Sequence, residues 1–293
     1  MKLLIYGAGV IGCLYAALFG EAGYDVYVYA RGKRLETLKK HGLLYIKNKR
    51  VNKAKVNIVD KVENSDIYDF IFLTVKENQA HTALAELSEN KSPNIVTMVN
   101  TLESYGNWEK ICGHSRIIPA FPGAGGSFEG NVLKAALTPK IIQPTTFGEI
   151  SGEKTLRITA LENIFRSSGI PYHIVKKMHD WQLCHLAMVV PIADAYYEAD
   201  NPEKAGNETA LMYRTAYRIK RNFQILHRMG IEICPPKMNL FRIIPTAVLS
   251  VGLGSVFKSN FGKVFMYCHS MNAPDEMRSL HRQFYGFIKK SMR

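Results

Sequence analysis

Three glycines near the start of the chain, Gly7, Gly9 and Gly12, follow the spacing G-x-G-x-x-G. They separate a short apolar segment, residues 2–6, from a segment of helical composition, residues 11–22. In such a strand–turn–helix unit the first glycine permits the turn, the second lets a phosphate approach the backbone, and the third lets helix and strand pack closely. The motif predicts an α/β domain with a phosphate site at its first helix. A glycine-rich turn without a ligand is the alternative.

Alternating strand and helix patterns continue through the first half of the chain. Residues 24–29, 69–75 and 94–99 are typical of strands, and the run Asp-Phe-Ile-Phe-Leu-Thr-Val has a continuous apolar centre, as a parallel sheet covered on both faces requires. A strand pair is expected over 43–60. Helices are expected over 33–40, 78–89 and 156–167, and further strands over 117–118, 145–149 and 172–175. The pattern predicts a Rossmann domain with a doubly wound parallel sheet over residues 1–175.

The pattern changes after residue 176, where long helical periods replace strands. Helices are expected over 179–197, 207–229, 239–260 and 272–290, the third interrupted by Pro245. We therefore predict an all-α C-terminal domain, residues 176–293, for substrate binding or dimerisation. A homodimer is one option that the sequence leaves open.

Composition narrows the class of protein. The five cysteines are an odd number and scattered singly, and the nine histidines show no ligand spacing, so neither a disulfide framework nor a metal site is expected. Lys2 before the apolar run 3–19 resembles a signal peptide, but the glycine spacing favours a strand, turn and helix. No other apolar stretch is long enough to span a membrane. We expect a cytoplasmic protein without a membrane partner.

The chain is basic, with a net charge of +13, and 15 Lys and Arg against 5 Asp and Glu follow residue 200. Arg214, Arg218 and Arg221 recur at helical spacing. A solvated helix face is the plain interpretation, and a phosphate-rich ligand is the other. No base-stacking motif accompanies the charge, so nucleic acid is not the expected partner.

The residues after the second predicted strand indicate which dinucleotide is bound. An NAD-binding domain usually ends this strand with an acidic residue that binds the ribose 2′-hydroxyl, whereas an arginine accommodates the 2′-phosphate of NADP. Here the strand ends Tyr29-Ala30-Arg31, with no carboxylate before Glu36. Arg31, assisted by Lys33 or Arg34, therefore predicts NADP (NADPH). The remaining cofactor contacts are expected from the fingerprint, Gly7, Ala8, Gly9, Val10, Ile11 and Gly12.

The chain resembles the ketopantoate reductase (2-dehydropantoate 2-reductase) family, in particular its shorter branch. The motifs that carry the resemblance are the fingerprint with Arg31, Thr74-Val75-Lys76 with Gln79, Asn100, Phe121-Pro122-Gly123-Ala124-Gly125-Gly126, Pro144-Thr145-Thr146-Phe147-Gly148-Glu149, and Asp180-Trp181 followed by His185, Pro191, Ile192 and Ala193.

The resemblance implies an oxidoreductase of pantothenate biosynthesis that uses NADPH to reduce 2-dehydropantoate, a small anionic keto acid, to pantoate. It places Lys76, Asn100 and Gly126 against the cofactor. It also implies catalytic roles for Asn100 and for Glu276, which would bind the substrate hydroxyl. Ser259 or Ser270 would be a further substrate contact.

One position departs from the family pattern. Leu183 stands where the family has a lysine, two residues after Trp181, and leucine can neither donate a proton nor stabilise an alkoxide. Lys76 could supply the positive charge, and His179, four residues before Leu183 on the same helix, could face the same way. Two other functions stay open: reduction of a different 2-keto acid, and a catalytically impaired NADP-binding sensor.

Overall fold

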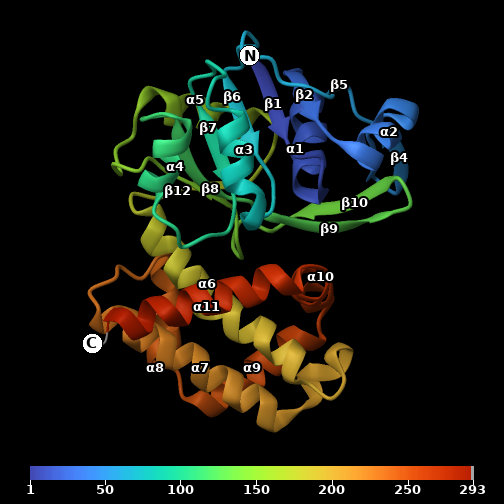
Figure 1. Cartoon of the computed structure of the whole chain (residues 1–293). Helices are drawn as coiled ribbons and strands as arrows, with labels where there is room; N and C mark the ends of the chain where they lie inside the picture. Colours follow the sequence, from blue (N-terminus) through green and yellow to red (C-terminus); the bar gives the residue numbers. More distant parts are fainter. Residues whose placement is uncertain (292–293) are drawn as a thin grey trace. The chain divides into compact units, whose positions relative to one another are not determined.

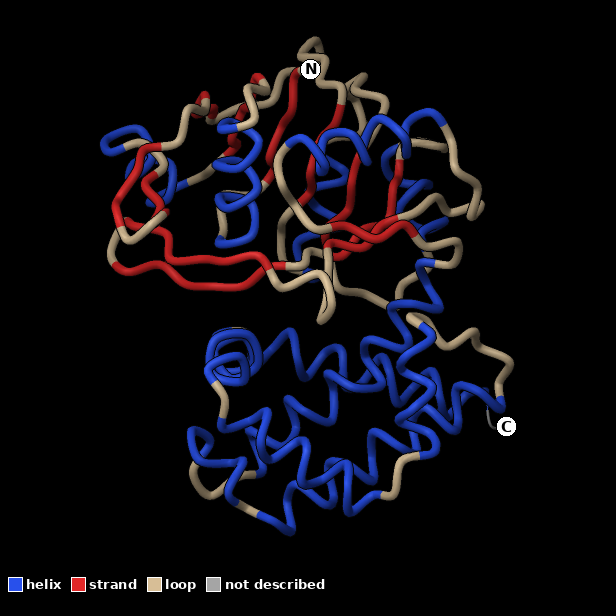
Figure 2. Tube along the Cα trace, turned by 180° about the vertical axis from the view of Figure 1, so that it is seen from behind, coloured by secondary structure: helices blue, strands red, loops and turns tan. Residues whose placement is uncertain are grey.

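The computed structural model describes residues 1–291 (Figure 1). The chain divides into two compact units, Met1–Met178 and His179–Arg293. In the described residues every strand belongs to the first unit, and the second contains only helices and loops (Figure 2). The predicted class, a Rossmann sheet followed by an all-α region, is confirmed.

An eight-stranded sheet forms the centre of the first unit. Its spatial order is β12-β11-β8-β7-β6-β1-β2-β5. The bounds are β1 (Lys2–Tyr6), β2 (Asp25–Tyr29), β5 (Asn57–Val59), β6 (Phe70–Leu73), β7 (Ile95–Met98), β8 (Ile117–Phe121), β11 (Thr145–Phe147) and β12 (Tyr172–Ile174). Neighbouring strands are parallel except for β8 and β11. No crossover helix joins these two in the described chain, and a parallel pair would need such a connection.

Helices cover both faces of this sheet. They are α1 (Val10–Glu21), α2 (Gly32–His41), α3 (Ala80–Glu86), α4 (Tyr105–Cys112) and α5 (Leu156–Ser167). Leu3 and Ile5 of β1 share one core with Phe19 of α1 and Phe165 of α5. Alternate residues such as Leu4 face the other way, where α3 and α4 pack together. The central strand β6, Phe-Ile-Phe-Leu, is therefore apolar and buried throughout because both of its faces are covered.

A second, four-stranded sheet was not predicted in full. Its order is β4-β3-β10-β9, with bounds β3 (Leu44–Lys47), β4 (Arg50–Lys53), β9 (Ala124–Glu129) and β10 (Val132–Leu137). The sequence indicated the pair β3–β4 but not the hairpin β9–β10. Both hairpin strands pack against α1, and residues 12–17 of that helix are all buried. Six consecutive buried residues cover every side of a helix, so α1 is enclosed.

The second unit is built from α6 (Met178–Glu198), α7 (Thr209–Arg228), α8 (Leu240–Ile243), α9 (Thr246–Lys258), α10 (Cys268–Asn272) and α11 (Pro274–Ser291). Pro245 separates α8 from α9, as predicted, because proline has no N–H to donate to the preceding turn and its ring crowds that turn. Among the described residues, no helix combines the length and apolar character needed to cross a membrane.

Candidate functional site

The three fingerprint glycines meet different surroundings. A Cβ on Gly12 would lie 2.0 Å from the Gly7 carbonyl oxygen and 2.5 Å from Thr74 Oγ1, so only glycine lets α1 approach the sheet this closely. Gly7 has a φ of +120°, which L side chains rarely adopt. A Cβ on Gly9 would meet nothing within 4 Å. Packing therefore explains Gly7 and Gly12, whereas Gly9 borders open space.

A cavity of about 300 Å³ lies at the carboxyl ends of β1, β2 and β6. Predicted cofactor residues that line it are Gly7, Ala8, Gly9, Arg31 and Lys76. Tyr6, Tyr29, Thr74 and Gln79 complete much of the wall. The carboxyl ends of parallel strands are where open α/β sheets bind their ligands. These segments lie together because each directly follows a strand of the sheet.

The N-terminus of α1 opens at this cavity. Gly9 is the N-cap residue, and no side chain caps the helix, so Val10 and Ile11 begin a first turn whose N–H groups are not bonded by a capping side chain. Uncapped N–H groups and the helix dipole attract anions. Thr74 Oγ1 donates to the Gly7 carbonyl oxygen at 2.8 Å and fixes the turn. This end of α1 is therefore suited to hold a diphosphate.

Arg34 holds the glycine turn in place. Its Nε donates to the Ala8 carbonyl oxygen at 3.0 Å, and its guanidinium lies 4.0 Å from the centre of the Phe128 ring. Lys33 is exposed on the first turn of α2. Arg34 was predicted to assist at a 2′-phosphate. Its Nε already binds the glycine turn, and this contact gives Arg34 a structural role of its own.

Arg31 lies at the rim of the cavity and is paired with a residue that the sequence did not indicate. Its Nη1 lies 3.0 Å from Oε1 of Glu86, the last residue of α3. The hydroxyl of buried Tyr6 donates to the other oxygen of the same carboxylate. Burial, and then the contact with Glu86, raises the pKa of Tyr6. Glu86 is 55 positions from Arg31, so no local pattern could have revealed it.

Asn100 follows β7 and is buried, as its predicted role requires. Its side-chain Oδ1 has no hydrogen-bond partner within residues 1–291. Most buried polar atoms in proteins have a hydrogen-bond partner, and an atom without one calls for an explanation, such as a role in the function. Lys76, by contrast, is exposed and precedes the short 3₁₀ turn Glu77–Gln79.

Gly126 lies in β9, opposite Ala135 of β10. A Cβ there would come within 2.3 Å of the Lys134 carbonyl oxygen. Sheet packing alone therefore accounts for this glycine. Its predicted cofactor contact stays a prediction.

The Phe-Pro-Gly segment before β9 is anchored by a buried polar cluster. The hydroxyls of Tyr15 and Thr145 lie 2.5 Å apart, and the Gly123 N–H donates to Tyr15 at 3.2 Å. The sequence did not predict this link between α1, the Gly123 turn and β11.

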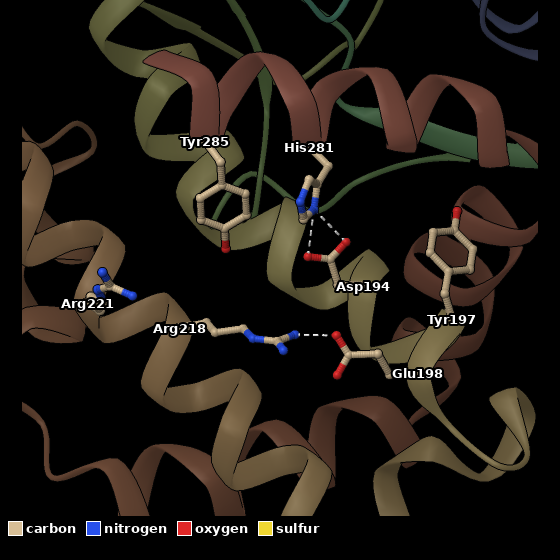
Figure 3. A pocket seen from close by; sticks show the side chains of 7 residues that line it. All are labelled: Asp194, Tyr197, Glu198, Arg218, Arg221, His281 and Tyr285. Carbon is tan, nitrogen blue, oxygen red and sulfur yellow. Dashed lines mark hydrogen bonds and ion pairs between the residues drawn. The ribbon is translucent and has the colours of Figure 1, made fainter. Parts of the chain in front are cut away.

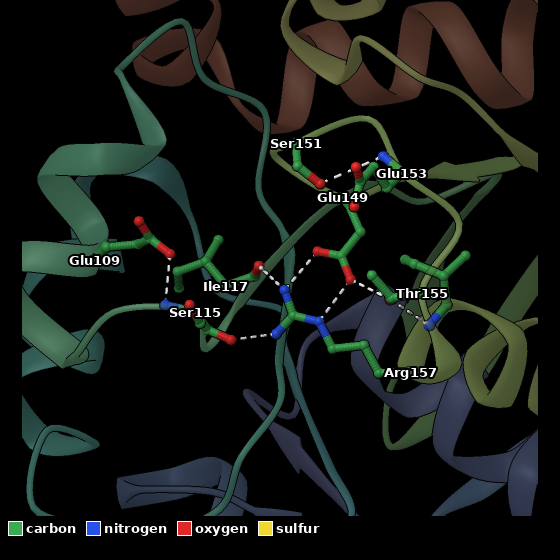
Figure 4. A network of polar contacts seen from close by, with 9 residues as sticks. Glu109, Ser115, Ile117, Glu149, Ser151, Glu153, Thr155 and Arg157 are labelled. Carbon is green, nitrogen blue, oxygen red and sulfur yellow. Dashed lines mark hydrogen bonds and ion pairs between the residues drawn. The ribbon is translucent and has the colours of Figure 1, made fainter.

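Glu149 belongs to a second buried network, shown in Figure 4. It accepts hydrogen bonds from Arg157 Nε at 2.7 Å, from Arg157 Nη2 at 2.5 Å and from the Thr155 hydroxyl at 2.5 Å. Burial alone would raise the pKa of Glu149, but these bonds and the arginine charge together lower it. Arg157 also donates to the carbonyls of Ser115 and Ile117. This network connects β8, β11 and α5.

In the helical unit, Leu183 is fully buried on α6. His179 packs edge-on against Phe287. Glu276 is half-buried in the first turn of α11. The hydroxyl of Ser259 donates to the Val256 carbonyl oxygen, and the backbone carbonyl of Ser270 accepts a hydrogen bond from the Tyr197 hydroxyl.

A polar cavity of about 360 Å³ lies within the helical unit (Figure 3). Its wall is formed by α6, α7 and α11, through Asp194, Tyr197, Glu198, Arg218, Arg221, His281 and Tyr285. His281 Nδ1 contacts both Asp194 oxygens, at 2.9 and 3.0 Å, and Arg218 pairs with Glu198 at 2.5 Å. Of the three arginines at helical spacing, Arg218 and Arg221 thus line this cavity, while Arg214 is exposed. The sequence predicted none of these contacts.

Comparison with known proteins identifies the family. The family model for "Ketopantoate reductase PanE/ApbA" matches residues 3–150, half of the chain. The chain belongs to this family. The matched ketopantoate reductase segment contains the fingerprint, Arg31, Lys76, Asn100 and Gly126.

Within the described residues, His, Cys, Asp and Glu form no group of three that could hold a metal ion.

Two curated 2-dehydropantoate 2-reductases illustrate the similarity. That of Archaeoglobus fulgidus is 35% identical over 115 residues, 39% of this chain and 36% of the relative. That of Mesorhizobium japonicum is 30% identical over 138 residues, 46% of this chain and 38% of the relative. The matched parts span less than two-fifths of either relative.

Among solved structures, the 2-dehydropantoate 2-reductase of Methylococcus capsulatus has a similar fold. The alignment covers 100% of this chain and 98% of the Methylococcus chain. The TM-score is 0.65 at 14% sequence identity, so this likeness concerns the fold.

Proposed function

We propose that the protein reduces a small 2-keto acid with NADPH, and that the substrate is 2-dehydropantoate, which becomes pantoate. The observation that carries this proposal is the cavity at the ends of β1, β2 and β6, where an uncapped helix N-terminus, the open position Gly9 and Arg31 converge. An anionic dinucleotide fits these groups, because they offer N–H donors and a guanidinium. Family membership supplies the reaction class.

Each predicted residue has a role in this proposal. The fingerprint backbone binds the diphosphate, and Arg31 binds the 2′-phosphate. When bound, the reduced nicotinamide supplies a hydride to the keto carbon, so negative charge develops on the keto oxygen. Asn100 orients the cofactor or the substrate. Its buried Oδ1, which has no partner in the described residues, accepts a hydrogen bond from the amide of the cofactor or from the hydroxyl of the substrate. Lys76 supplies positive charge, because Leu183 cannot. Gly126 remains proposed for the cofactor and Glu276 for the substrate hydroxyl, on the family resemblance.

The first test is NADPH oxidation at 340 nm by the purified protein with 2-dehydropantoate, compared with pyruvate and 2-oxoisovalerate. Turnover that is fastest with 2-dehydropantoate is the expected result. Faster turnover with another keto acid would keep the reaction class and change the substrate. The absence of turnover with every keto acid, in protein that binds NADPH by calorimetry, would overturn the enzymatic proposal.

That last outcome would favour a cofactor-binding sensor, and Leu183 is the observation behind this second candidate. Introducing the family lysine by Leu183→Lys is a poor way to distinguish the two, because the position is fully buried. An ammonium group there would lose its hydration without a designed partner, which is strongly unfavourable. Turnover by the unaltered protein is therefore the decisive measurement.

A further inference from the structure

Glu86 contacts two residues that line the cofactor cavity, Arg31 and Tyr6. Its carboxylate is bound by Arg31 through one oxygen and by Tyr6 through the other. The Tyr6 ring lies 4.5 Å from the Tyr29 ring, at the end of β2. The side chains of Glu86 and Arg31 are 38% and 55% exposed, so a ligand can reach both.

This position is the one where Rossmann domains distinguish their cofactors. A carboxylate at the end of β2 accepts a hydrogen bond from the ribose 2′-hydroxyl of NAD, whereas an arginine there accommodates the 2′-phosphate of NADP. The chain presents both groups near the end of β2, the arginine from the loop that follows the strand and the carboxylate from the end of α3. A prediction of the cofactor from the residues that follow β2 takes only the arginine into account, because Glu86 is 55 positions away in the sequence.

The two groups have opposite effects on a 2′-phosphate. Arg31 attracts it, but the guanidinium already has an anionic partner, which the phosphate must displace. The carboxylate itself repels a phosphate that carries about two negative charges. For the 2′-hydroxyl of NADH the same carboxylate is an acceptor, and Arg31 can stay paired with it.

We propose that Glu86 determines cofactor specificity: it weakens the preference for NADPH that Arg31 creates and makes NADH a second cofactor. This inference rests on the proposed dinucleotide site and goes beyond it. Glu86 acts on the bound ribose and on Arg31, and it has no part in hydride transfer.

A purely structural role for Glu86 predicts the opposite sign. If the carboxylate served only to hold Arg31 ready for a phosphate, its loss would weaken NADPH binding and leave NADH binding unchanged. If Glu86 competes with the phosphate, its loss strengthens NADPH binding and weakens NADH binding. The sign of the change in NADPH affinity therefore separates the two roles.

The experiment is calorimetric titration of the full chain with NADPH and with NADH, for the unaltered protein and for Glu86→Gln. We expect the ratio of Kd for NADH to Kd for NADPH to rise between about 3-fold and 30-fold in Glu86→Gln, from the usual size of exposed charge interactions acting on a doubly charged phosphate. Glu89→Gln is the matched control, because Glu89 is an exposed carboxylate three positions further on. It should leave the ratio unchanged.

Two further variants secure the interpretation. Glu86→Ala repeats the test with a residue that favours helices, should the glutamine variant fold poorly. In an Arg31→Gln background, Glu86→Gln should raise NADPH affinity less, because competition for Arg31 is gone. An unchanged or lower ratio in a folded Glu86 variant would overturn the inference alone. Failure of the unaltered protein to bind either dinucleotide would overturn the proposed function as well.

Discussion

Gly9 and Gly12 belong to one motif, but glycine is needed at the two positions for different reasons. Gly12 lies under the Gly7 carbonyl and Thr74, where any side chain would overlap backbone. Gly9 has a φ of −77°, which other residues adopt freely, and its missing side chain leaves open space. The fold therefore requires glycine at position 12, whereas at position 9 the requirement comes from whatever enters the cavity.

Substituting the two glycines should separate folding from binding. Gly9→Ala should change the free energy of unfolding by less than about 1 kcal/mol but weaken NADPH binding at least about tenfold, because its methyl group would stand where the diphosphate approaches. Gly12→Ala should lower the unfolding free energy by about 2–3 kcal/mol through overpacking. Chemical denaturation and calorimetric titration measure both. Unimpaired NADPH binding by Gly9→Ala would contradict the placement of the diphosphate.

The sequence could predict that residues shortly after the sheet strands lie close together. Gly7, Gly9 and Arg31 are examples, since they follow β1 or β2 within three residues and line one cavity. Glu86 and the Tyr15–Thr145 pair could not be predicted, because their partners are distant in sequence and meet only in the folded sheet. The predicted binding roles of the fingerprint residues and Arg31 stay predictions, as do those of Lys76, Asn100, Gly126 and Glu276.

At the scale of elements, the ion pair of Glu149 and Arg157 connects three segments of the first unit, β8, β11 and α5. Glu149 follows β11, Arg157 lies in the first turn of α5, and the arginine reaches two carbonyls beside β8. The Glu149 side chain is 5% exposed and that of Arg157 22%. Removing either charge would leave the other largely buried without its partner, which costs more than the loss of a surface pair.

We expect Glu149→Gln to lower the free energy of unfolding by about 2–3 kcal/mol, because a neutral amide replaces a charged acceptor of three hydrogen bonds. Urea denaturation followed by circular dichroism measures the change. Glu153→Gln, at an exposed carboxylate in the same loop, should shift it by less than about 0.5 kcal/mol. Equal shifts in the two variants would show that the buried network contributes no more than a surface charge.

The elements themselves were predictable to different degrees. β1, β6 and β7 are mostly apolar, and α5 and α7 have clear helical period, so their sequence patterns were sufficient. The hairpin β9–β10 was missed because β9, Ala-Gly-Gly-Ser-Phe-Glu, has neither alternation nor an apolar run. Its strands are stabilised by pairing with each other and by packing on α1, and neither contact is visible locally.

For the whole molecule, one buried histidine links stability to pH. His185 stacks on Trp181 with ring centres 5.2 Å apart, and burial lowers the pKa of His185 to about 3. An unfolded histidine titrates near 6.5. Between these values the unfolded chain binds a proton that the folded chain does not. Stability is therefore fully present above about pH 6.5 and falls as the pH drops toward 3, by up to about 1.4 kcal/mol per pH unit from this residue.

His185→Gln should make the acid limb of the stability curve shallower by about one proton. Denaturation midpoints and m-values between pH 7 and pH 4 give the free energy at each pH. His114→Gln, at a histidine whose side chain is 85% exposed, should leave the slope unchanged. Identical slopes in the unaltered protein and His185→Gln would show that His185 titrates normally in the folded state.

The enclosure of α1 between two sheets has a consequence for dynamics. Backbone amides in residues 13–20 have no route to solvent through local fraying, so their hydrogens should exchange with deuterium only when the first unit opens as a whole. A ligand at the N-terminus of this helix favours the closed form in proportion to its occupancy. These amides should thus exchange more slowly as NADPH is added, and their exchange rates would report how much of the protein holds its cofactor.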